Sequence, residues 1–546
     1  MPTVPQQPPD RGPDASAPTA APAAGVEHEA EHATARETRS AAAVAAGILL
    51  SRLVGLLRQR ITAHYFGTSS LADVLTAAFR VGNITQNLLG EGSLSASFIP
   101  VYAKLRGEGR DDEAVRFAQS ALGLLVALVV VVSAVGVAFA PGLSWIVAAG
   151  FDADKLDATA RIVRIVFPMT GLLVLCAWGL GVLNSHRRFF VPYAAPVIWS
   201  AVQIAALLVA GSWLRRRGEP LADALAWGAL LGAAIELGVL LRAARAVLGG
   251  LRLRFEARNP HVREAMRRLP GVLIGRGVVQ ISGYVDTLLV SFLGTGANAI
   301  FGYAQMIYLL PMSLLGTGEA AVSLPEMSRD TAEQDVGLRN QALRRRLGSA
   351  LARVTVLTVP TVVGLVVLGR ELITVLLQTG EFDRASTMRV AEVLAVYGLA
   401  LLGNASVRVL ATSCYALGDT RRPASYAVVR VAASTAIALA LMRPLGVVGV
   451  VIGATVAAWL EALMLGWQVR RTLGGLGLEQ LRVARLALLG LACVAIPVGV
   501  RAALPAGFAA SPLGSAVVLC ALPVAFVPVA QWLGLFDLRS YLRRAR

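Results

Sequence analysis

Residues 44–103 read VAAGILLSRLVGLLRQRITAHYFGTSSLADVLTAAFRVGNITQNLLGEGSLSASFIPVYA and form two apolar segments separated by a short Gly-Thr-Ser-Ser turn. Each segment is long enough to cross the ~30 Å hydrocarbon core of a bilayer as a helix. Charged side chains nevertheless lie well inside both segments: Arg52, Arg58, Asp73, Arg80 and Glu91. An ionised group at bilayer depth is costly unless it faces a partner or a watery cavity. The two segments therefore predict a membrane cavity that holds an anionic ligand.

The composition of the whole chain predicts a polytopic membrane protein. Of 546 residues, 56% are hydrophobic and only 16% are charged, against about a quarter in an average soluble domain. The mean hydropathy is +0.64. Apolar runs near 20 residues long predict an all-α polytopic fold of about 14 transmembrane helices, at 41–66, 71–103, 117–140, 160–183, 191–213, 223–247, 270–293, 299–324, 348–368, 386–416, 423–442, 446–469, 483–503 and 513–534.

The net charge of +17 is explained by topology. Most of the 51 Lys and Arg residues fall in alternate loops, which is the positive-inside pattern and predicts that both termini lie in the cytoplasm. Arg215, Arg216 and Arg217 form the exception, because they fall in an outer loop. This placement argues against a nucleic-acid partner.

The remaining composition argues against a secretory leader, a metal centre and an enzyme. Residues 1–40 lack a basic start followed by an apolar run and are predicted to be a disordered cytoplasmic tail. The five histidines are scattered along the chain, so we expect no metal site and no catalytic arrangement. Four cysteines stand alone in different apolar segments and are expected to be small core residues, namely Cys176, Cys414, Cys493 and Cys520.

Short motifs recur at nearly constant spacing and predict an internal repeat. Phe66-Gly67-Thr68 closes the first segment, as Leu293-Gly294-Thr295 closes the seventh. Arg187-Arg188 precedes Pro192, as Arg421-Arg422 precedes Pro423. Six helices separate the copies, and an even number of spans returns the chain to the same side of the membrane. Both halves therefore enter the membrane in the same sense and are expected to be related by a pseudo-twofold axis along the membrane normal.

The repeat predicts the domain organisation. An N-terminal lobe of six helices covers residues 41–250, and a C-terminal lobe of six helices, opening with an amphipathic linker, covers 251–472. The last two helices and a cytoplasmic C-terminus occupy 473–546. Two lobes with charge at their interface are typical of alternating-access transporters.

The second segment carries a polar stripe. At about 100° per residue, Asp73, Arg80, Asn87 and Glu91 fall within about 40° of one another, with Asn83 near the same edge. A continuous helix over 71–103 would be about 50 Å long, well beyond the bilayer core. We therefore expect it to bend at Gly90-Glu91-Gly92.

Several of the charged residues also have a structural interpretation. Arg60, near the outer end of its segment, is expected to snorkel. Asp73 and Arg80 are seven residues apart and fit an ion pair as well as a ligand site. Glu91, between two glycines, fits either a solvated helix break or an acidic gate.

Arg52 and Arg58 favour a ligand more strongly. Neither has an acidic neighbour within one turn of its own helix, so an anionic ligand or a partner on another helix is expected. Further polar points lie in the second half, at Arg276, Asp286, Glu319, Asn404, Arg408 and Arg430.

The sequence resembles the MurJ (MviN) family of lipid II flippases, within the wider MATE-like exporter (MOP) superfamily. The resemblance covers about residues 44–472. It rests on Ser51-Arg52-Leu53-Val54-Gly55 with Arg58, Phe66-Gly67 followed by Ala72-Asp73, Gly90-Glu91-Gly92 leading to Ser97-Phe98-Ile99-Pro100, Val375 to Phe382, Tyr415-Ala416 with Asp419-Thr420 and Pro423, and Pro444-Leu445-Gly446-Val447-Val448-Gly449.

The resemblance implies a carrier, not an enzyme, that moves an undecaprenyl-pyrophosphate-linked peptidoglycan precursor from the cytoplasmic to the periplasmic leaflet of the bacterial inner membrane. The family's substrate-site residues fall on Arg52, Arg58, Asp73 and Glu91. Two family arginines are missing here, because their positions hold Gln86 and Met306.

A pyrophosphate ligand also agrees with the chemistry of the residues. Arginine is always charged and presents a planar donor fork that suits phosphate oxygens. Arg80, Gln86 and Arg276 complete the predicted substrate site. No cofactor is expected beyond a coupling monovalent cation or the membrane potential, and Asp286 and Asn404 are the candidate cation ligands.

Three other functions stay open. A flippase for another polyprenyl-linked oligosaccharide is favoured by the two missing arginines. A cation-coupled drug exporter would prefer acidic cavity residues. A non-transporting scaffold for envelope assembly would have a vestigial basic cavity. Membrane lipids and the cell-wall synthesis machinery are the other expected partners of the protein.

Overall fold

The computed structural model describes residues 46–312 and 335–535, and these are almost entirely helical. The N-terminal half contains a first helix over 46–66, followed by α2 (Ser70–Leu89), α3 (Glu91–Gly107), α4 (Asp111–Ala138), α5 (Ala140–Ala148), α6 (Ala153–Ser185), α7 (Phe190–Ala194), α8 (Pro196–Leu208), the π-helix η1 (Val209–Trp213) and α9 (Glu219–Leu248).

The C-terminal half begins with α10 and contains a helix over 297–312. Its other elements are α10 (Pro260–Ser291), α12 (Val336–Val366), α13 (Gly369–Leu376), α14 (Arg384–Ala416), α15 (Arg421–Leu473), the 3-10 helix η2 (Leu478–Leu481), α16 (Val483–Ala503), α17 (Ala506–Ala509) and α18 (Pro512–Trp532).

The helices agree with a multi-pass membrane protein. Nine helices among the described residues are long and apolar enough to cross a membrane. Each of the fourteen predicted segments overlaps a helix, although fourteen as a number of spans stays a prediction. The short helices α5, α13 and α17 were not predicted, because each is shorter than a span and lies between apolar segments.

Several helices begin at a residue whose side chain accepts a hydrogen bond from the first turn, which satisfies a backbone donor that the helix itself leaves free. These caps are Ser69 for α2, Asp152 for α6, Asn259 for α10, Asp335 for α12, Asp383 for α14 and Ser511 for α18.

Two glycines break long helices. The expected bend in the second segment is confirmed at Gly90, which separates α2 from α3; a Cβ there would collide with the carbonyl oxygen of Gln86. Gly446 has φ 59° and ψ −138° inside α15. Residues other than glycine rarely adopt this backbone conformation. Because it is not helical, α15 consists of two helices joined at a kink, in agreement with the predicted segments 423–442 and 446–469.

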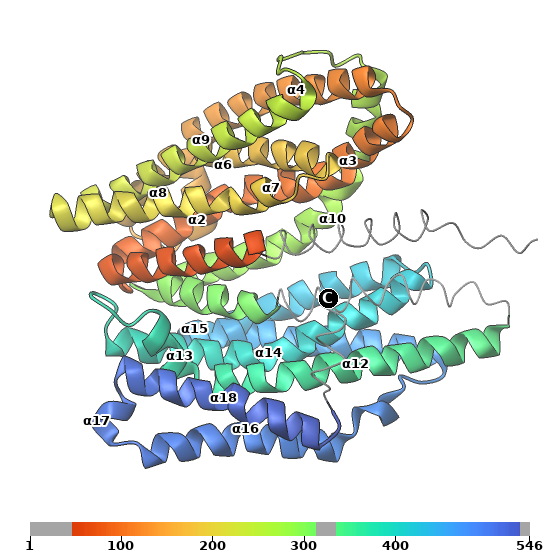
Figure 1. Cartoon of the computed structure of the whole chain (residues 1–546). Coiled ribbons are helices and arrows are strands. Elements are labelled where there is room, and N and C mark those ends of the chain that lie inside the picture. The colour runs from red at the N-terminus through yellow and green to blue at the C-terminus, as the bar shows by residue number, and fades with distance from the viewer. Residues whose placement is uncertain (1–45, 313–334, 536–546) are drawn as a thin grey trace, which may run out of the picture.

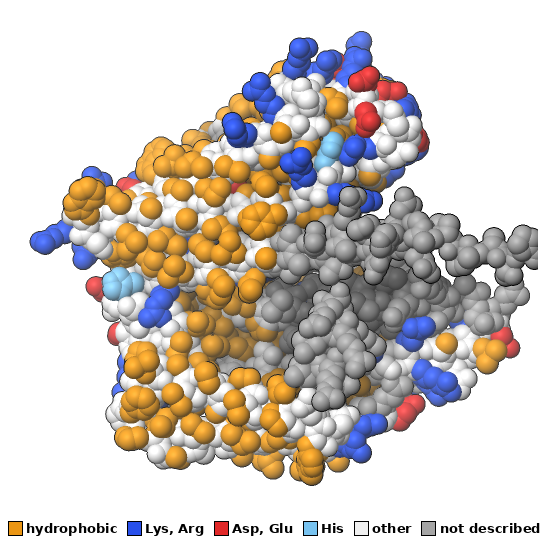
Figure 2. Space-filling view, viewed as in Figure 1, with side chains coloured by type: hydrophobic (Ala, Val, Ile, Leu, Met, Phe, Trp, Pro, Cys, Tyr) orange, Lys and Arg blue, Asp and Glu red, His pale blue; other side chains and the backbone are white. Residues whose placement is uncertain are grey.

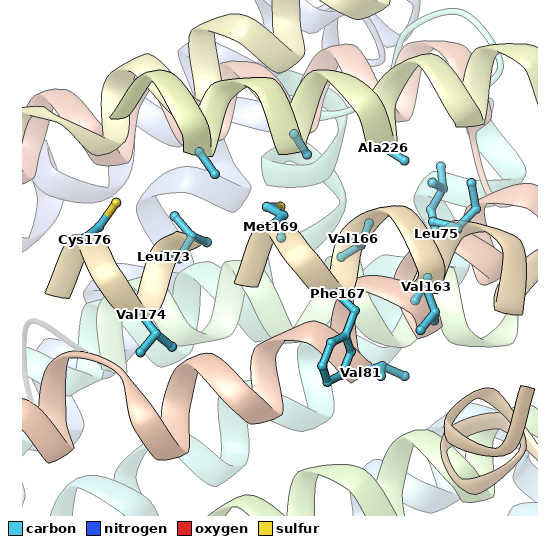
Figure 3. Packing of buried hydrophobic residues seen from close by; sticks show 14 of the residues in the cluster. Leu75, Val81, Val163, Val166, Phe167, Met169, Leu173, Val174, Cys176 and Ala226 are labelled. Atoms are coloured by element: carbon cyan, nitrogen blue, oxygen red, sulfur yellow. The ribbon is translucent and has the colours of Figure 1, made fainter. Parts of the chain in front are cut away.

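The helices form two groups with α10 between them (Figure 1). We call the group from the first helix to α9 the N-terminal lobe, and the group from α10 to α15 the C-terminal lobe. α10 packs against α2, α3 and α5 of the first lobe and against α15 of the second, and α16 and α18 pack against each other beside α12. Figure 3 shows the centre of the N-terminal lobe, where Val163, Phe167 and other side chains of α6 lie beside Leu75 and Val81 of α2.

The two ends of the bundle differ in charge. One end, which we call the basic end, contains the loops 107–110, 186–189, 249–259, 417–420 and 474–482. Here Arg116 binds Glu256 at 2.8 Å, and this hydrogen bond lowers the pKa of the Glu256 carboxyl.

Hydrophobic side chains cover the middle of the visible face, whereas Lys and Arg gather toward its margins (Figure 2). A broad apolar face with charged margins is the surface expected of a membrane protein.

At the opposite end the lobes contact each other along what we call the seam, formed by residues 60–68 and 375–389. The Glu381 amide donates to the His64 carbonyl at 2.9 Å, and the Thr68 and Ser386 hydroxyls lie 2.8 Å apart. The predicted snorkelling of Arg60 is wrong, because its guanidinium donates to the carbonyls of Val375 and Leu376 instead. The last turn of α13 therefore provides carbonyl partners for an arginine on the other lobe.

The turns of the predicted repeat also agree in backbone geometry. Gly67 has φ 53° and Gly294 has φ 89°, so both copies of the motif turn through a left-handed glycine at the seam end. The predicted cysteine environment is confirmed for three residues and wrong for Cys520, which is exposed on α18.

Candidate functional site

A cavity of about 370 Å³ brings three predicted arginines together. It lies where the first helix, α2, α8, α10 and the helix 297–312 meet, and we call it the arginine cavity. Its lining includes Arg52, Arg58, Arg80, Asn83, Gln305 and Met306. Among the described residues that line it, none is Asp or Glu. The cavity is therefore cationic, with amide and hydroxyl groups as its other polar functions.

Arg58 is positioned by α8. Its Nη1 donates to Oε1 of Gln203 at 3.2 Å, and its guanidinium carbon lies 4.6 Å from the centre of the Trp199 ring. An arginine stacked on an aromatic face keeps its edge available for further donors. Consistent with this, the buried Nε of Arg58 has no hydrogen-bond partner among the described residues.

Arg80 is positioned by the C-terminal lobe. It donates from Nη2 to Oε1 of Gln305 at 2.8 Å and to the carbonyl of Gly283 at 3.1 Å, and from Nε to Oγ1 of Thr287 at 3.2 Å. These contacts hold an N-terminal-lobe arginine against α10 and the helix 297–312. Arg80 therefore joins the two lobes at the cavity wall.

Arg52 contributes the exposed charge of the cavity. It is one turn and a half before Arg58 on the first helix and has no hydrogen-bond or ion-pair partner among the residues that the structure describes. Its guanidinium is thus a donor that a ligand can reach without breaking an internal contact.

Asp73 lies outside the arginine cavity. It is fully buried, binds Nζ of Lys155 at 2.7 Å and accepts hydrogen bonds from the amides of Gly296 and Ala299 at 2.7 and 2.9 Å. A carboxylate at a helix N-terminus satisfies free amides and interacts favourably with the helix dipole. The ion pair expected for Asp73 is therefore made with Lys155 rather than with Arg80, and it ties α2 and α6 to the helix 297–312.

Gln86 lies in a second cavity, of about 650 Å³, inside the N-terminal lobe. Its lining comes from α2, α3, α6, α7, α8 and α9 and includes Asn87, Cys176 and Glu236. We call it the glutamate cavity. The polar stripe on α2 is thus divided between three places along the helix: the contact with Lys155 and the helix 297–312 at Asp73, the arginine cavity at Arg80 and the glutamate cavity at Asn87.

Two predicted site residues, Glu91 and Arg276, lie in α3 and α10, but their side chains are not among those that the structure describes. Glu319 lies outside the described residues. The roles predicted for Glu91 and Arg276 stay predictions.

The candidate cation ligands Asp286 and Asn404 lie on either side of a tyrosine pair. Asn404 donates to the hydroxyl of Tyr308 at 2.9 Å, and Tyr308 stacks on Tyr397 at 4.8 Å between ring centres. Asp286 is buried and interacts electrostatically with Tyr397. Asn404 and Asp286 thus each interact with one tyrosine of the same stacked pair.

Sequence reasoning missed three groups that matter to this site. Trp199 and Gln203 position Arg58, and their apolar helix gave no signal for this contact. Lys155 falls between the predicted segments 117–140 and 160–183, so the segment pattern does not predict its burial with Asp73. Glu236 could have been found, because it is a single carboxylate in the middle of the apolar segment 223–247.

The fold and the cavity define a two-lobed, multi-pass membrane protein with a cationic internal cavity. A family model described as lipid II flippase MurJ matches residues 62–515. The chain belongs to the lipid II flippase MurJ family.

Individual relatives agree with this assignment. A probable lipid II flippase MurJ of Rhizobium tropici is 32% identical over 428 residues, which cover 77% of this chain and 79% of the relative. The lipid II flippase MurJ of Burkholderia cenocepacia is 29% identical over 440 residues, covering 79% and 84%.

Solved structures show the same fold. The chain is similar to a lipid II flippase MurJ in an inward closed conformation, with TM-score 0.72 and 19% identity over 89% of this chain and 97% of the other. It is also similar to an inward-facing multidrug resistance MATE family transporter of the MOP superfamily, with TM-score 0.63 and 15% identity over 81% and 99%.

Proposed function

We propose that this protein carries lipid II from the cytoplasmic to the periplasmic leaflet of the bacterial inner membrane, with the substrate pyrophosphate held in the arginine cavity. The observation that carries the proposal is the gathering of Arg52, Arg58 and Arg80 around one cavity whose described lining contains no carboxylate. Guanidinium groups in a site of reduced dielectric bind phosphate oxygens more strongly than they do in water.

Transport requires the two lobes to move relative to each other. In our proposal the basic end and both termini face the cytoplasm, in agreement with the positive-inside rule, and the seam closes the periplasmic side. Arg52 and Arg58 precede Arg60 on the first helix, so the arginine cavity lies on the cytoplasmic side of the seam. Breaking the seam would then expose the cavity to the periplasm.

Energy input is a further part of the proposal. The membrane potential or a monovalent cation gradient drives the cycle, with Asp286 and Asn404 as candidate cation ligands. The pair α16 and α18 extends the membrane-facing surface beside α12, and we propose that it guides the lipid tail. Contacts with the cell-wall synthesis machinery belong to the same proposal.

A second candidate is a flippase for another polyprenyl-linked oligosaccharide. Met306 lines the arginine cavity at a position where the family resemblance places an arginine, so this cavity has one cation fewer for its ligand. A drug exporter that binds cations is disfavoured by the same lining, because cationic side chains repel a cationic ligand.

Complementation tests the proposal and separates the two candidates. Cells depleted of their own lipid II flippase should grow, and should expose lipid II in the outer leaflet, when they carry this protein. A matched strain carrying the same protein with Arg58→Ala should do neither. Protein present in the membrane without any restored exposure of lipid II would contradict the proposal and favour the other oligosaccharide lipid.

A further inference from the structure

The glutamate cavity contains a buried carboxyl that has no partner among the described residues. Glu236 lies in the middle of α9 and is only 4% exposed. Its Oε2 atom is buried and has no hydrogen-bond partner among the described residues. The side chain lines the cavity together with Gln86, Asn87 and Cys176, so it borders an internal space large enough for water.

The other buried carboxylates of the described chain differ from Glu236. Glu461 binds Arg430 at 2.9 Å, Glu371 binds Arg501 at 3.2 Å and Asp73 binds Lys155 at 2.7 Å. Asp286 is buried within the electrostatic reach of Arg80 and Arg430. Three of these four carboxylates are thus in contact with a cation, and the fourth, Asp286, has two arginines within electrostatic reach.

Among the described residues, the helices packed against α9 bring no such cation to Glu236. The labelled elements in contact with α9 are α2, α6, α7, α8 and η1. From α6 the thiol of Cys176 interacts with Glu236, whereas Lys155 and Arg161 of that helix are bound to Asp73 and to Glu219 near the seam end.

The other described residues around α9 also leave Glu236 without a cation. α8 and η1 contain no titratable residue, and Tyr193 of α7 is within hydrogen-bond distance of Asn184. On α2, Arg80 is hydrogen-bonded to the C-terminal lobe. Arg242 of α9 itself is exposed toward the basic end.

We propose that Glu236 is a proton-binding site, at which the carboxyl exchanges a proton with water in the glutamate cavity. An unpaired carboxylate in the bilayer interior costs far more free energy than the neutral acid. A cavity mouth is available, because Asn87 and Ala96 both line the cavity and are exposed. The ligand of this site is therefore a proton, and its source is the aqueous side that the cavity faces.

The site is separate from the proposed substrate site. α2 contributes Arg80 and Asn83 to the arginine cavity, and Gln86 and Asn87 to the glutamate cavity. The two cavities share this helix but no lining residue. A test of proton binding at Glu236 therefore does not depend on which lipid the protein carries.

Carbodiimide labelling of the purified full-length protein tests the proposal. Dicyclohexylcarbodiimide reacts with protonated carboxyls in apolar surroundings, and mass spectrometry locates the modified residue. We expect modification of Glu236 that decreases as the pH rises. Glu461 in the same molecule is the internal control and should stay unmodified, because its carboxyl is paired with Arg430 at 2.9 Å.

Infrared spectroscopy provides a second measurement. The carbonyl stretch of a protonated carboxyl should be present in the parent and lost in Glu236→Gln. In Gln86→Arg, a guanidinium enters the same cavity and stabilises the carboxylate, so labelling of Glu236 should decrease several-fold. Absence of both labelling and the infrared difference would overturn the proposal. Labelling suppressed by sodium at constant pH would also overturn it, since the ligand would then be a metal ion.

Discussion

At the scale of single residues, the arginine cavity depends on how each guanidinium is positioned. Arg58 is stacked on Trp199, Arg80 is hydrogen-bonded to the C-terminal lobe and Arg52 is unpaired among the described residues. Arg52 and Arg58 thus have donors available to a ligand. Arg80 instead uses its donors to bind the C-terminal lobe, so its position depends on how the two lobes are arranged.

Arg58→Ala should abolish flipping while the protein stays in the membrane at a near-normal level. A hydrogen bond to a charged group contributes about 1.5–3 kcal/mol, so substrate affinity should decrease by roughly 10- to 100-fold. Arg58→Lys should rescue only partly, because an ammonium lacks the planar fork. Arg245→Ala, an exposed arginine on α9, is the matched control. Full complementation by Arg58→Ala would show that the arginine cavity is not the substrate site.

The two missing family arginines should behave differently when they are restored. Met306→Arg adds a cation to the arginine cavity and should be tolerated or increase outer-leaflet exposure of lipid II. Gln86→Arg places the cation in the glutamate cavity and should bring no such gain. Equal effects of the two substitutions in the depleted strain would contradict the separation of the cavities.

At the scale of helices, the Asp73–Lys155 pair joins three elements that are distant in sequence. Asp73→Asn leaves Lys155 buried without its partner and should destabilise the protein by about 3–5 kcal/mol. Thermal unfolding in detergent would show this as a lower midpoint. Asp73→Asn with Lys155→Met removes the uncompensated charge and should unfold at a higher temperature than Asp73→Asn alone. A double variant that is no more stable would mean that the pair is not what stabilises this junction.

The helices also show which features sequence periodicity can predict and which it cannot. The break at Gly90 was predictable, because one continuous helix would be too long for the bilayer and glycine is the weak point. The short helix α13 and the seam were not predictable. Several of their contacts are made by backbone groups, such as the α13 carbonyls that accept from Arg60, and the backbone has no residue-specific signal in the sequence.

For the site, sequence reasoning placed Arg52, Arg58 and Arg80 correctly in one cavity, since charge inside an apolar helix must face a partner or a watery space. It did not separate Gln86 from these arginines. That separation arises from the direction in which each part of α2 faces after the lobe has packed, which a single helix cannot reveal.

At the scale of the whole molecule, topology is the first testable feature. In a background without the native cysteines, Ser69→Cys should react with an impermeant thiol reagent in intact cells, because Ser69 is exposed at the seam end. Arg188→Cys, exposed at the basic end, should react only after lysis. Labelling of Arg188→Cys in intact cells would reverse the orientation.

Alternating access predicts that the seam must open once in every transport cycle. The Thr68 and Ser386 hydroxyls lie 2.8 Å apart across the seam, so a cysteine pair at these positions suits a disulfide. Such a bond would hold the periplasmic side closed without altering the arginine cavity. Each single cysteine variant is the control for the substitution itself.

The most direct measurement is therefore the outer-leaflet exposure of lipid II in flippase-depleted cells that carry Thr68→Cys/Ser386→Cys, before and after addition of a reductant. Our account predicts no exposure in the oxidised protein and recovery to the level of the single variants once the disulfide is reduced. Equal exposure with the disulfide shown to be intact would contradict transport through this cavity by opening of the seam.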